Sequence, residues 1–145
     1  MPGFAVWPNH IKAGSQSSEK LLLMDIYPTL AEITGAPVKQ KIDGVSFLPV
    51  LKNSDEKMAA RPLFFSRREG FGFMGKTSQA VVNGNMKLLQ NGPFLPLELY
   101  DLGQDPLEQT NLIDKQNPQK QQLQQLLMLQ IQKSGSVPWQ KPRSN

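Results

Sequence analysis

A hairpin signal at Asn83-Gly84 restricts the fold of this chain more than any other feature of its sequence. The dipeptide lies between two runs, 79–83 and 86–90, in which apolar and polar residues alternate. Both central residues of a type I′ turn need a positive φ, and Asn-Gly is a preferred pair for it. The sequence therefore predicts two antiparallel strands joined by a type I′ turn at Asn83-Gly84.

Two more apolar runs extend this hairpin into a sheet. Leu97–Tyr100 follows a Gly-Pro break, and residues 62–67 precede a glycine-rich loop at 69–77. Asp105-Pro106 ends the pattern, because proline cannot donate a ladder hydrogen bond. The four runs predict an antiparallel meander of four strands.

The last part of the chain predicts a helix that begins at Asn117-Pro118, since proline is tolerated in a first helical turn. Gly135 predicts its end, and many glutamines cover the face opposite an apolar stripe of Leu123, Leu126, Leu127, Met128 and Ile131. We therefore predict an α+β fold in which a four-stranded antiparallel sheet is packed by a C-terminal helix.

The first third of the chain predicts a strand followed by a helix. The apolar run 4–7 ends at Pro8 and predicts a buried strand near the start of the chain. Asp25 is a good N-cap, and Gly35 can end a helix in the left-handed conformation. Three apolar residues of this helix fall on one face, namely Ile26, Leu30 and Ile33.

A charged and polar segment without periodicity, 52–61, predicts a surface linker. It divides the chain into a first region, 1–60, and a second region, 61–145.

Composition excludes several classes of function. The absence of cysteine excludes disulfides, thiolate metal sites and a cysteine nucleophile. The net charge of +4 comes from scattered basic residues, whereas nucleic-acid binders usually carry a basic stripe or cluster. We therefore expect neither nucleic acid nor, since no apolar run has the length of a span, a membrane as partner. No signal peptide is visible, and localisation stays open.

Several polar residues suggest sites but have simpler interpretations. His10 has no second histidine or cysteine to form a metal site and is interpreted as a surface residue. Asp25 and Asp43 would be paired carboxylates in an acid–base site, but a helix cap and a turn former explain them better. An acidic cluster lacks the spacing of a calcium loop and is assigned to turns and caps; it comprises Glu98, Asp101, Asp105 and Glu108.

The loop 67–76 is the best candidate for substrate binding. Arg67, Arg68 and Lys76, with two aromatic residues between them, lie in a segment that contains three glycines. Such a loop can contact an anionic ligand or a sugar, because arginine binds oxyanions well. The competing interpretation is a solvated basic connection.

Two motif strings give the chain a resemblance to a known family. The pattern "aV..G.wKLl" followed by "ELYDL..DP.E..NL" covers residues 80–112, and "WPNHI", "DIYPTL" and "DGVSFLPVL" precede it. Together they resemble the C-terminal portion of type I sulfatases, the arylsulfatase-like sulfuric ester hydrolases. The resemblance implies that residues 1–60 are the end of an α/β, alkaline-phosphatase-like catalytic domain and 61–145 a C-terminal subdomain.

The resemblance also implies where the chemistry lies. Family members use a formylglycine, made from Cys or Ser in a C/S-x-P-x-R motif, and a calcium ion, both in the N-terminal catalytic region. Ser136-Val137-Pro138-Trp139-Gln140 has Gln in place of the required Arg and is rejected as a chance match. We therefore assign no catalytic and no metal-binding residue, and expect the chain alone to be inactive.

The expected partners are an N-terminal sulfatase catalytic region and, in the intact enzyme, a sulfated substrate. Family members are often exported or periplasmic. The alternative is a stand-alone binding module that uses the loop 67–76, or the helix at 118–133, as its contact surface.

Overall fold

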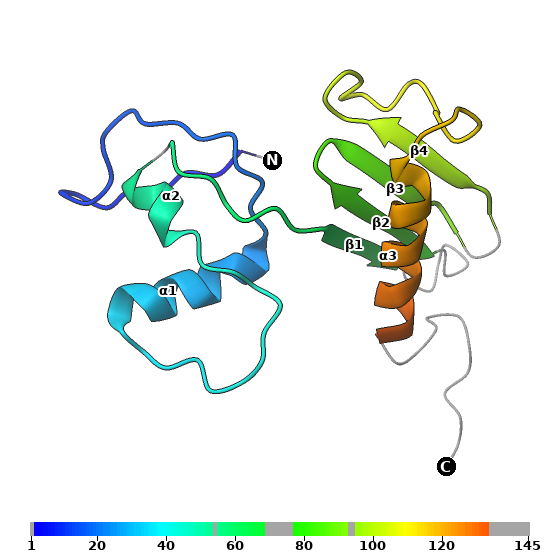
Figure 1. Ribbon diagram of the computed structural model, residues 1–145. Helices are drawn as coiled ribbons and strands as arrows, with labels where there is room; N and C mark the ends of the chain where they lie inside the picture. Colours follow the sequence, from blue (N-terminus) through cyan, green and yellow to red (C-terminus); the bar gives the residue numbers. More distant parts are fainter. Residues whose placement is uncertain (1, 54, 69–76, 93–94, 134–145) are drawn as a thin grey trace, which may run out of the picture. The chain divides into compact units, whose positions relative to one another are not determined.

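The computed structural model describes residues 2–53, 55–68, 77–92 and 95–133 of the 145-residue chain. The chain forms two compact units, Met1–Ala59 and Ala60–Asn145 (Figure 1). The first unit contains a 3-10 helix, η1 (Leu23–Asp25), and two α-helices, α1 (Ile26–Thr34) and α2 (Leu48–Lys52). The second unit contains a sheet and one long helix.

The sheet of the second unit is an antiparallel meander. Its four strands lie in the order of the sequence, so each pairs with the next along the chain; they are β1 (Leu63–Arg68), β2 (Thr77–Asn83), β3 (Met86–Gln90) and β4 (Leu97–Asp101). The predicted four-stranded sheet is confirmed.

The β2–β3 turn lies one residue later than predicted. Asn83 pairs with Met86, so Gly84 and Asn85 are the central residues of the turn. Gly84 has a φ of 59°, whereas the non-glycine residues with positive φ in the described ranges are Asn9 and Glu108. A positive φ at the first central residue alone is typical of a type II′ turn, which favours glycine there. The type I′ assignment was therefore wrong.

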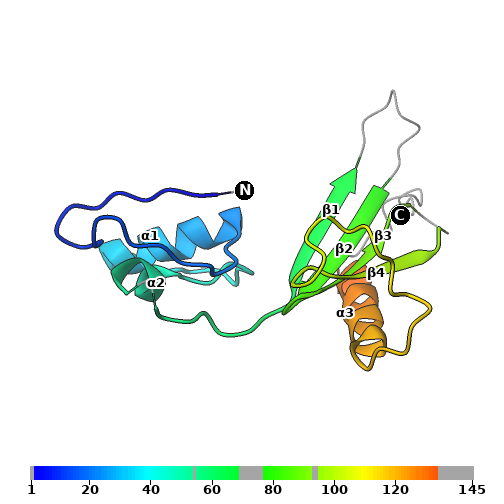
Figure 2. The ribbon, with the colours of Figure 1, turned by 90° about the horizontal axis from the view of Figure 1, so that it is seen from above.

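The core of the second unit lies between the sheet and α3 (Gln119–Lys133). Figure 2 shows α3 on one face of the sheet. The register places Val81, Leu88 and Leu99 side by side, and none of the three is exposed to solvent. Leu123 and Leu127 of α3 pack against them, which confirms the predicted helix.

The apolar stripe of α3 is narrower than predicted. Met128 was assigned to it, but its side chain is 56% exposed, because it lies one residue beyond the inward-facing Leu127. The helix begins as expected: the Asn117 side-chain oxygen accepts a hydrogen bond of 2.9 Å from the backbone N–H of Gln119. The predicted end at Gly135 lies outside the described residues.

The outer edge of β4 is covered by the segment that follows it. The backbone N–H of Leu99 donates to the Asn111 side-chain oxygen at 3.0 Å, and the Leu99 carbonyl accepts from the N–H of Leu112 at 2.7 Å. The carbonyl of Asp101 accepts from the N–H of Asp105, also at 2.7 Å. The N–H and carbonyl of Leu99 and the carbonyl of Asp101 are therefore satisfied within this chain.

In the first unit, the buried side chain of Asp25 binds two separate backbone segments. One carboxylate oxygen accepts from the N–H of Leu22 at 2.8 Å and the other from the N–H of Val45 at 2.9 Å. Asp25 occupies the N-cap position of α1 but makes no side-chain cap hydrogen bond to it. The predicted N-cap position is therefore confirmed, but the side-chain hydrogen bond to α1 is absent. The carboxylate instead joins the loop at 43–47 to η1.

Thr29 and Gly44 complete this junction. The Thr29 hydroxyl donates to the Asp25 carbonyl at 2.6 Å and accepts from the N–H of Phe47 at 3.0 Å. A Cβ at Gly44 would lie 2.1 Å from the carbonyl oxygen of Met24, so only glycine fits this close approach. The loop therefore follows η1 and α1 at backbone contact distance.

The predicted strand at 4–7 was wrong. Residues 4–7 form no strand, and Phe4 and Val6 are 96% and 91% exposed, because no other described segment pairs with them. The apolar face of α1 is exposed as well: Ile26 and Leu30 are 44% and 54% exposed, while the buried residues are Thr29 and Ala31. The polar junction at Asp25, together with a small group of buried apolar residues (Ala31, Leu48 and Val50), thus orders this unit. The predicted left-handed end at Gly35 is confirmed by its φ of 69°.

Replacing Asp25 with Asn should loosen this junction. The Asn side chain has one acceptor oxygen, so its NH₂ group would face a second backbone N–H that remains unsatisfied. We expect a loss of about 1–3 kcal/mol in the local stability of the 43–47 loop. The rate of hydrogen exchange at the Val45 amide measures this loss of local stability. The exposed Asp55→Asn is the control, and equal exchange in both variants would contradict this role.

Candidate functional site

The predicted basic site lies at the end of the β1–β2 ladder. Arg67 pairs with Ser78 and Arg68 with Thr77, which is the last pair of the ladder. The side chain of Arg67 is exposed. Lys76, the third predicted residue, lies outside the described residues. The structure thus places the two arginines at one end of the sheet, and their role in substrate binding stays a prediction.

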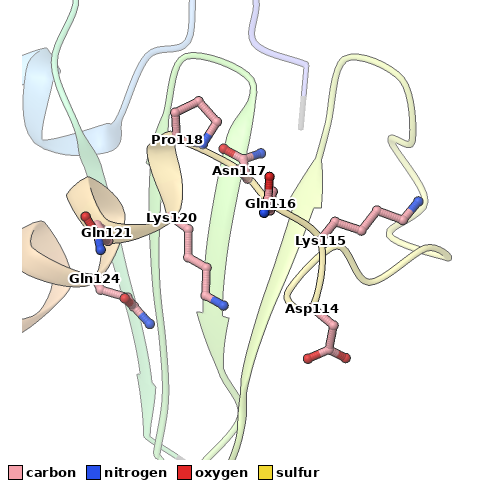
Figure 3. A pocket seen from close by; sticks show the side chains of 8 residues that line it. All are labelled: Asp114, Lys115, Gln116, Asn117, Pro118, Lys120, Gln121 and Gln124. Atoms are coloured by element: carbon pink, nitrogen blue, oxygen red, sulfur yellow. The ribbon is translucent and has the colours of Figure 1, made fainter.

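An open groove of about 870 Å³ lies at the start of α3 (Figure 3). The segment before the helix and the first turns of α3 form it, and its lining residues are Asp114, Lys115, Gln116, Asn117, Pro118, Lys120, Gln121 and Gln124. These residues carry no sequence signal for a site, since Asn117-Pro118 indicates only a helix start.

The composition of this groove differs from that of a typical ligand pocket. Small-molecule sites are mostly lined by apolar and aromatic side chains, whereas here Pro118 is the one apolar lining residue. The ammonium group of Lys120 already donates to the carbonyl of Ile113 at 2.7 Å, which ties the helix to the preceding segment. The groove is a polar surface depression.

The motif residues of the second unit form a polar network on the sheet. Lys87 and Glu108 form an ion pair in which the ammonium lies 2.6 and 2.7 Å from the two carboxylate oxygens. Both side chains are partly buried, at 21% and 30% exposure. Glu108 has a φ of 57°, a conformation that costs a non-glycine residue free energy. The pair stabilises this strained turn, and sequence analysis missed it, since nothing in the spacing relates residues 87 and 108.

Tyr100 lies opposite Lys87 in the β3–β4 ladder. Its hydroxyl donates to a Glu98 carboxylate oxygen at 2.7 Å, and the other oxygen of Glu98 accepts from the Asn91 amide at 2.9 Å. This hydrogen bond, the burial of the ring and the negative charges of Glu98, Glu108 and Asp105 raise the pKa of Tyr100 from 10.0 to about 12. Tyr100 is therefore a protonated donor at neutral pH.

The acidic cluster has structural roles. Asp101 accepts from the N–H of Gly103 at 2.9 Å and Asp105 from the N–H of Thr110 at 2.7 Å, which confirms their assignment to turns. The bond from Thr110, with others from neighbouring backbone groups, lowers the pKa of Asp105. Glu98 and Glu108 instead bind side chains. Within the described ranges, His, Asp and Glu side chains form no group of three that would hold a metal ion.

His10 is exposed, as predicted, and packs locally. Its ring stacks on that of Trp7 with centroids 4.0 Å apart, and its Nδ1 lies 3.0 Å from the carbonyl oxygen of Pro8. These contacts fit a surface histidine that closes the turn at 7–10. No helix in the described part of the chain has the length and apolar character of a membrane span.

Comparison with known proteins identifies similar sequences. Residues 1–136 match the family model described as "N-sulphoglucosamine sulphohydrolase, C-terminal". The chain is 30% identical to the "Ulvan-active sulfatase" of Formosa agariphila, over 88% of this chain and 31% of that protein. It is 35% identical to human "Arylsulfatase K", over 72% of this chain and 21% of that protein.

A solved structure has a similar fold. It is described as BT4656 in complex with its substrate D-glucosamine-2-N,6-O-disulfate, and it matches with a TM-score of 0.76 and 27% identity. The match covers 93% of this chain and 29% of that one. The chain thus spans less than a third of the length of each of these proteins.

Replacing Glu98 with Gln should lower the pKa of Tyr100, because the amide is uncharged and can donate to the phenolate. A Tyr27→Phe background leaves one tyrosine, so its ultraviolet absorbance reports Tyr100 alone. We expect a midpoint near 12 in that background and a lower one after Glu98→Gln. Glu32→Gln, at an exposed position of α1, is the control.

The stability of the protein should follow the same titration. A folded pKa above 10.0 means that Tyr100 contributes its full stabilisation below pH 10 and loses it as the pH rises toward about 12.

An unchanged absorbance midpoint after Glu98→Gln would show that Glu98 does not cause the shift in the pKa of Tyr100.

Proposed function

The chain belongs to the sulfatase family described as N-sulphoglucosamine sulphohydrolase, C-terminal, and we propose that it forms the C-terminal part of an enzyme that hydrolyses sulfate esters. The resemblance to type I sulfatases expected from the sequence is thereby confirmed. The match over residues 1–136 carries the proposal, because it extends through both units. The α+β fold, with its likeness to a solved protein in complex with its substrate D-glucosamine-2-N,6-O-disulfate, agrees with it.

We propose carbohydrate sulfates as the substrate class, with aryl sulfates as the second choice. The descriptions of two similar proteins and of the matching family support this order. One is described as ulvan-active, one is bound to a disulfated glucosamine, and the family description names N-sulphoglucosamine. A sulfated glucosamine is therefore the first substrate to test.

The sulfatase family generally uses formylglycine and calcium, and we propose that the enzyme holds both outside this chain. The chain contains no cysteine, and its nearest approach to the C/S-x-P-x-R motif, at Ser136, has Gln140 in place of the required arginine. Within the described ranges, no three His, Asp or Glu side chains form a group that could hold a metal ion. The residues present therefore do not fit either group, and no catalytic step is assigned to them. Their proposed role is to complete the enzyme and to border its substrate site.

The exposed surface of the first unit supports a role within a larger protein. Leu23, Tyr27 and Leu30 are 82%, 52% and 54% exposed, and they lie within eight consecutive residues of η1 and α1. An exposed apolar patch of this kind usually marks a contact surface. We propose that the N-terminal catalytic region covers it, which favours this function over a stand-alone binding module.

The proposed contact with substrate is the basic end of the β1–β2 ladder. Arg67 is exposed there, and a guanidinium group binds a sulfate through paired, charge-assisted hydrogen bonds. We retain Arg67, Arg68 and Lys76 as the proposed substrate-binding residues, with no metal ligand and no catalytic residue in this chain.

The purified chain should release no sulfate from glucosamine-2-N,6-O-disulfate. A hybrid in which it replaces the matching part of the ulvan-active sulfatase should release sulfate, because the relative supplies the catalytic region. Ion chromatography of free sulfate measures both. Two results would contradict the proposal. One is turnover by the chain alone, and the other is a hybrid that unfolds cooperatively but is inactive on carbohydrate and aryl sulfates.

In this hybrid, replacing Arg67 and Arg68 together with Ala should lower kcat/KM. Loss of charge-assisted hydrogen bonds of about 1.5–3 kcal/mol corresponds to a decrease of roughly 10- to 100-fold. Arg61→Ala is the matched control, since it precedes β1 at the opposite end of the strand. If the double Arg67→Ala, Arg68→Ala variant keeps the wild-type kcat/KM, as the Arg61→Ala control should, the loop is a connection and not a substrate contact.

A further inference from the structure

The face of the sheet opposite α3 carries an exposed aromatic ring beside a basic residue. Phe64 packs against the core beneath α3, and side chains alternate along a strand, so Phe65 and Arg67 lie on the other face of β1 (Figure 2). Both are exposed, and the exposed fraction of Phe65 is 47%. Among the large apolar side chains described in the four strands, that of Phe65 alone is exposed.

The neighbours of this ring across the ladder are small. Phe65 pairs with Ala80 and Arg67 with Ser78, so no long side chain of β2 stands beside the ring. β1 is also an edge strand of the sheet. Two residues of a strand span about 7 Å. The ring and the guanidinium group therefore form an open platform, with an apolar surface at one end and a positive charge at the other.

The charge around this platform favours an anionic ligand. Arg67 is the one charged residue that the described parts of β1 and β2 place on this face of the sheet. Glu98 lies on the same face but belongs to β4, so two strands separate it from Phe65, a distance of about 14 Å. Its carboxylate already accepts hydrogen bonds from Tyr100 and Asn91.

We propose that the Phe65 ring stacks on the pyranose ring of a sulfated sugar while Arg67 binds one of the sulfate groups of that sugar. The inference rests on the proposed function and names the groups of the substrate that β1 contacts. Glucosamine carries equatorial substituents at C2 to C5, so both faces of its ring present C–H groups. The electron-rich face of an aromatic ring attracts such groups, and close packing adds dispersion.

Phe65 would thereby select the sugar and Arg67 the sulfate. An axial hydroxyl on the stacked face would hold the pyranose away from the aromatic ring, so the platform favours sugars of the gluco configuration. The competing occupant is the N-terminal catalytic region. A protein contact of that kind accepts any apolar side chain of similar size, whereas stacking requires an aromatic ring at position 65.

Titration of the complete 145-residue chain with glucosamine-2-N,6-O-disulfate tests this contact. Nuclear magnetic resonance should show a shift of the Phe65 ring signals and an upfield shift of the C–H protons on one face of the sugar, with a Kd on the order of 1 mM. Inorganic sulfate, which has no pyranose ring, should leave the Phe65 ring signals unchanged.

Two substitutions at this position separate stacking from a general apolar contact. Phe65→Leu should raise the Kd about fivefold, the size of an aromatic stacking contribution, and remove the upfield shift of the sugar protons. Phe65→Tyr keeps the ring and should preserve both. Tyr27→Leu is the matched control, since Tyr27 is an aromatic residue of α1 with 52% exposure, and it should bind like the wild type.

Two results would overturn the inference. One is a Phe65 ring whose signals do not move up to about 20 mM sugar, well above the expected Kd. The other is a Phe65→Leu variant with the Kd of the wild type. The release of sulfate by the hybrid enzyme tests the proposed function separately, so an active hybrid without the Phe65 shift would remove this inference alone. A shift at Phe65 with an inactive hybrid would leave the sugar contact and remove the proposed function.

Discussion

The register of the sheet is the constraint on which the second unit depends. Val81, Leu88 and Leu99 lie in one row, fully buried beneath α3. Because side chains alternate between the faces of a sheet, a shift of one residue in any strand would remove its member from this row. The same register brings Lys87 beside Tyr100 on the opposite face, where Glu108 joins the network. The apolar core and the polar network thus depend on the same strand register.

Sequence reasoning recovered the second unit better than the first, for a physical reason. The strands and α3 are set by local alternation, turn residues and a helical stripe, all of which can be read within about twenty residues. The first unit instead depends on hydrogen bonds that the side chains of Asp25 and Thr29 accept from backbone N–H groups of a loop 20 and 18 residues away. Hydrophobic periodicity gives no sign of such long-range contacts. An apolar run such as 4–7 cannot form a strand without a neighbouring segment to pair with.

The features of the candidate site also differ in whether the sequence alone could predict them. The basic residues at 67 and 68 were selected from composition, and the ladder places them together at its end. The pairing of Lys87 with Glu108 and the groove before α3 depend on how the segment 102–118 folds back, which no short motif encodes. The family motif itself proves to be largely architectural, since Asp101, Asp105, Glu108 and Asn111 hold turns and strand edges.

The covered edge of β4 affects how this sheet can meet other molecules. An open strand edge is a template for pairing with a neighbouring chain, and such pairing leads to aggregation and fibre growth. Here a foreign strand would first have to displace Asn111 and Leu112 from Leu99. The side chain of Asn111 and the backbone of Leu112 thus hinder amyloid-like extension on that side of the folded sheet.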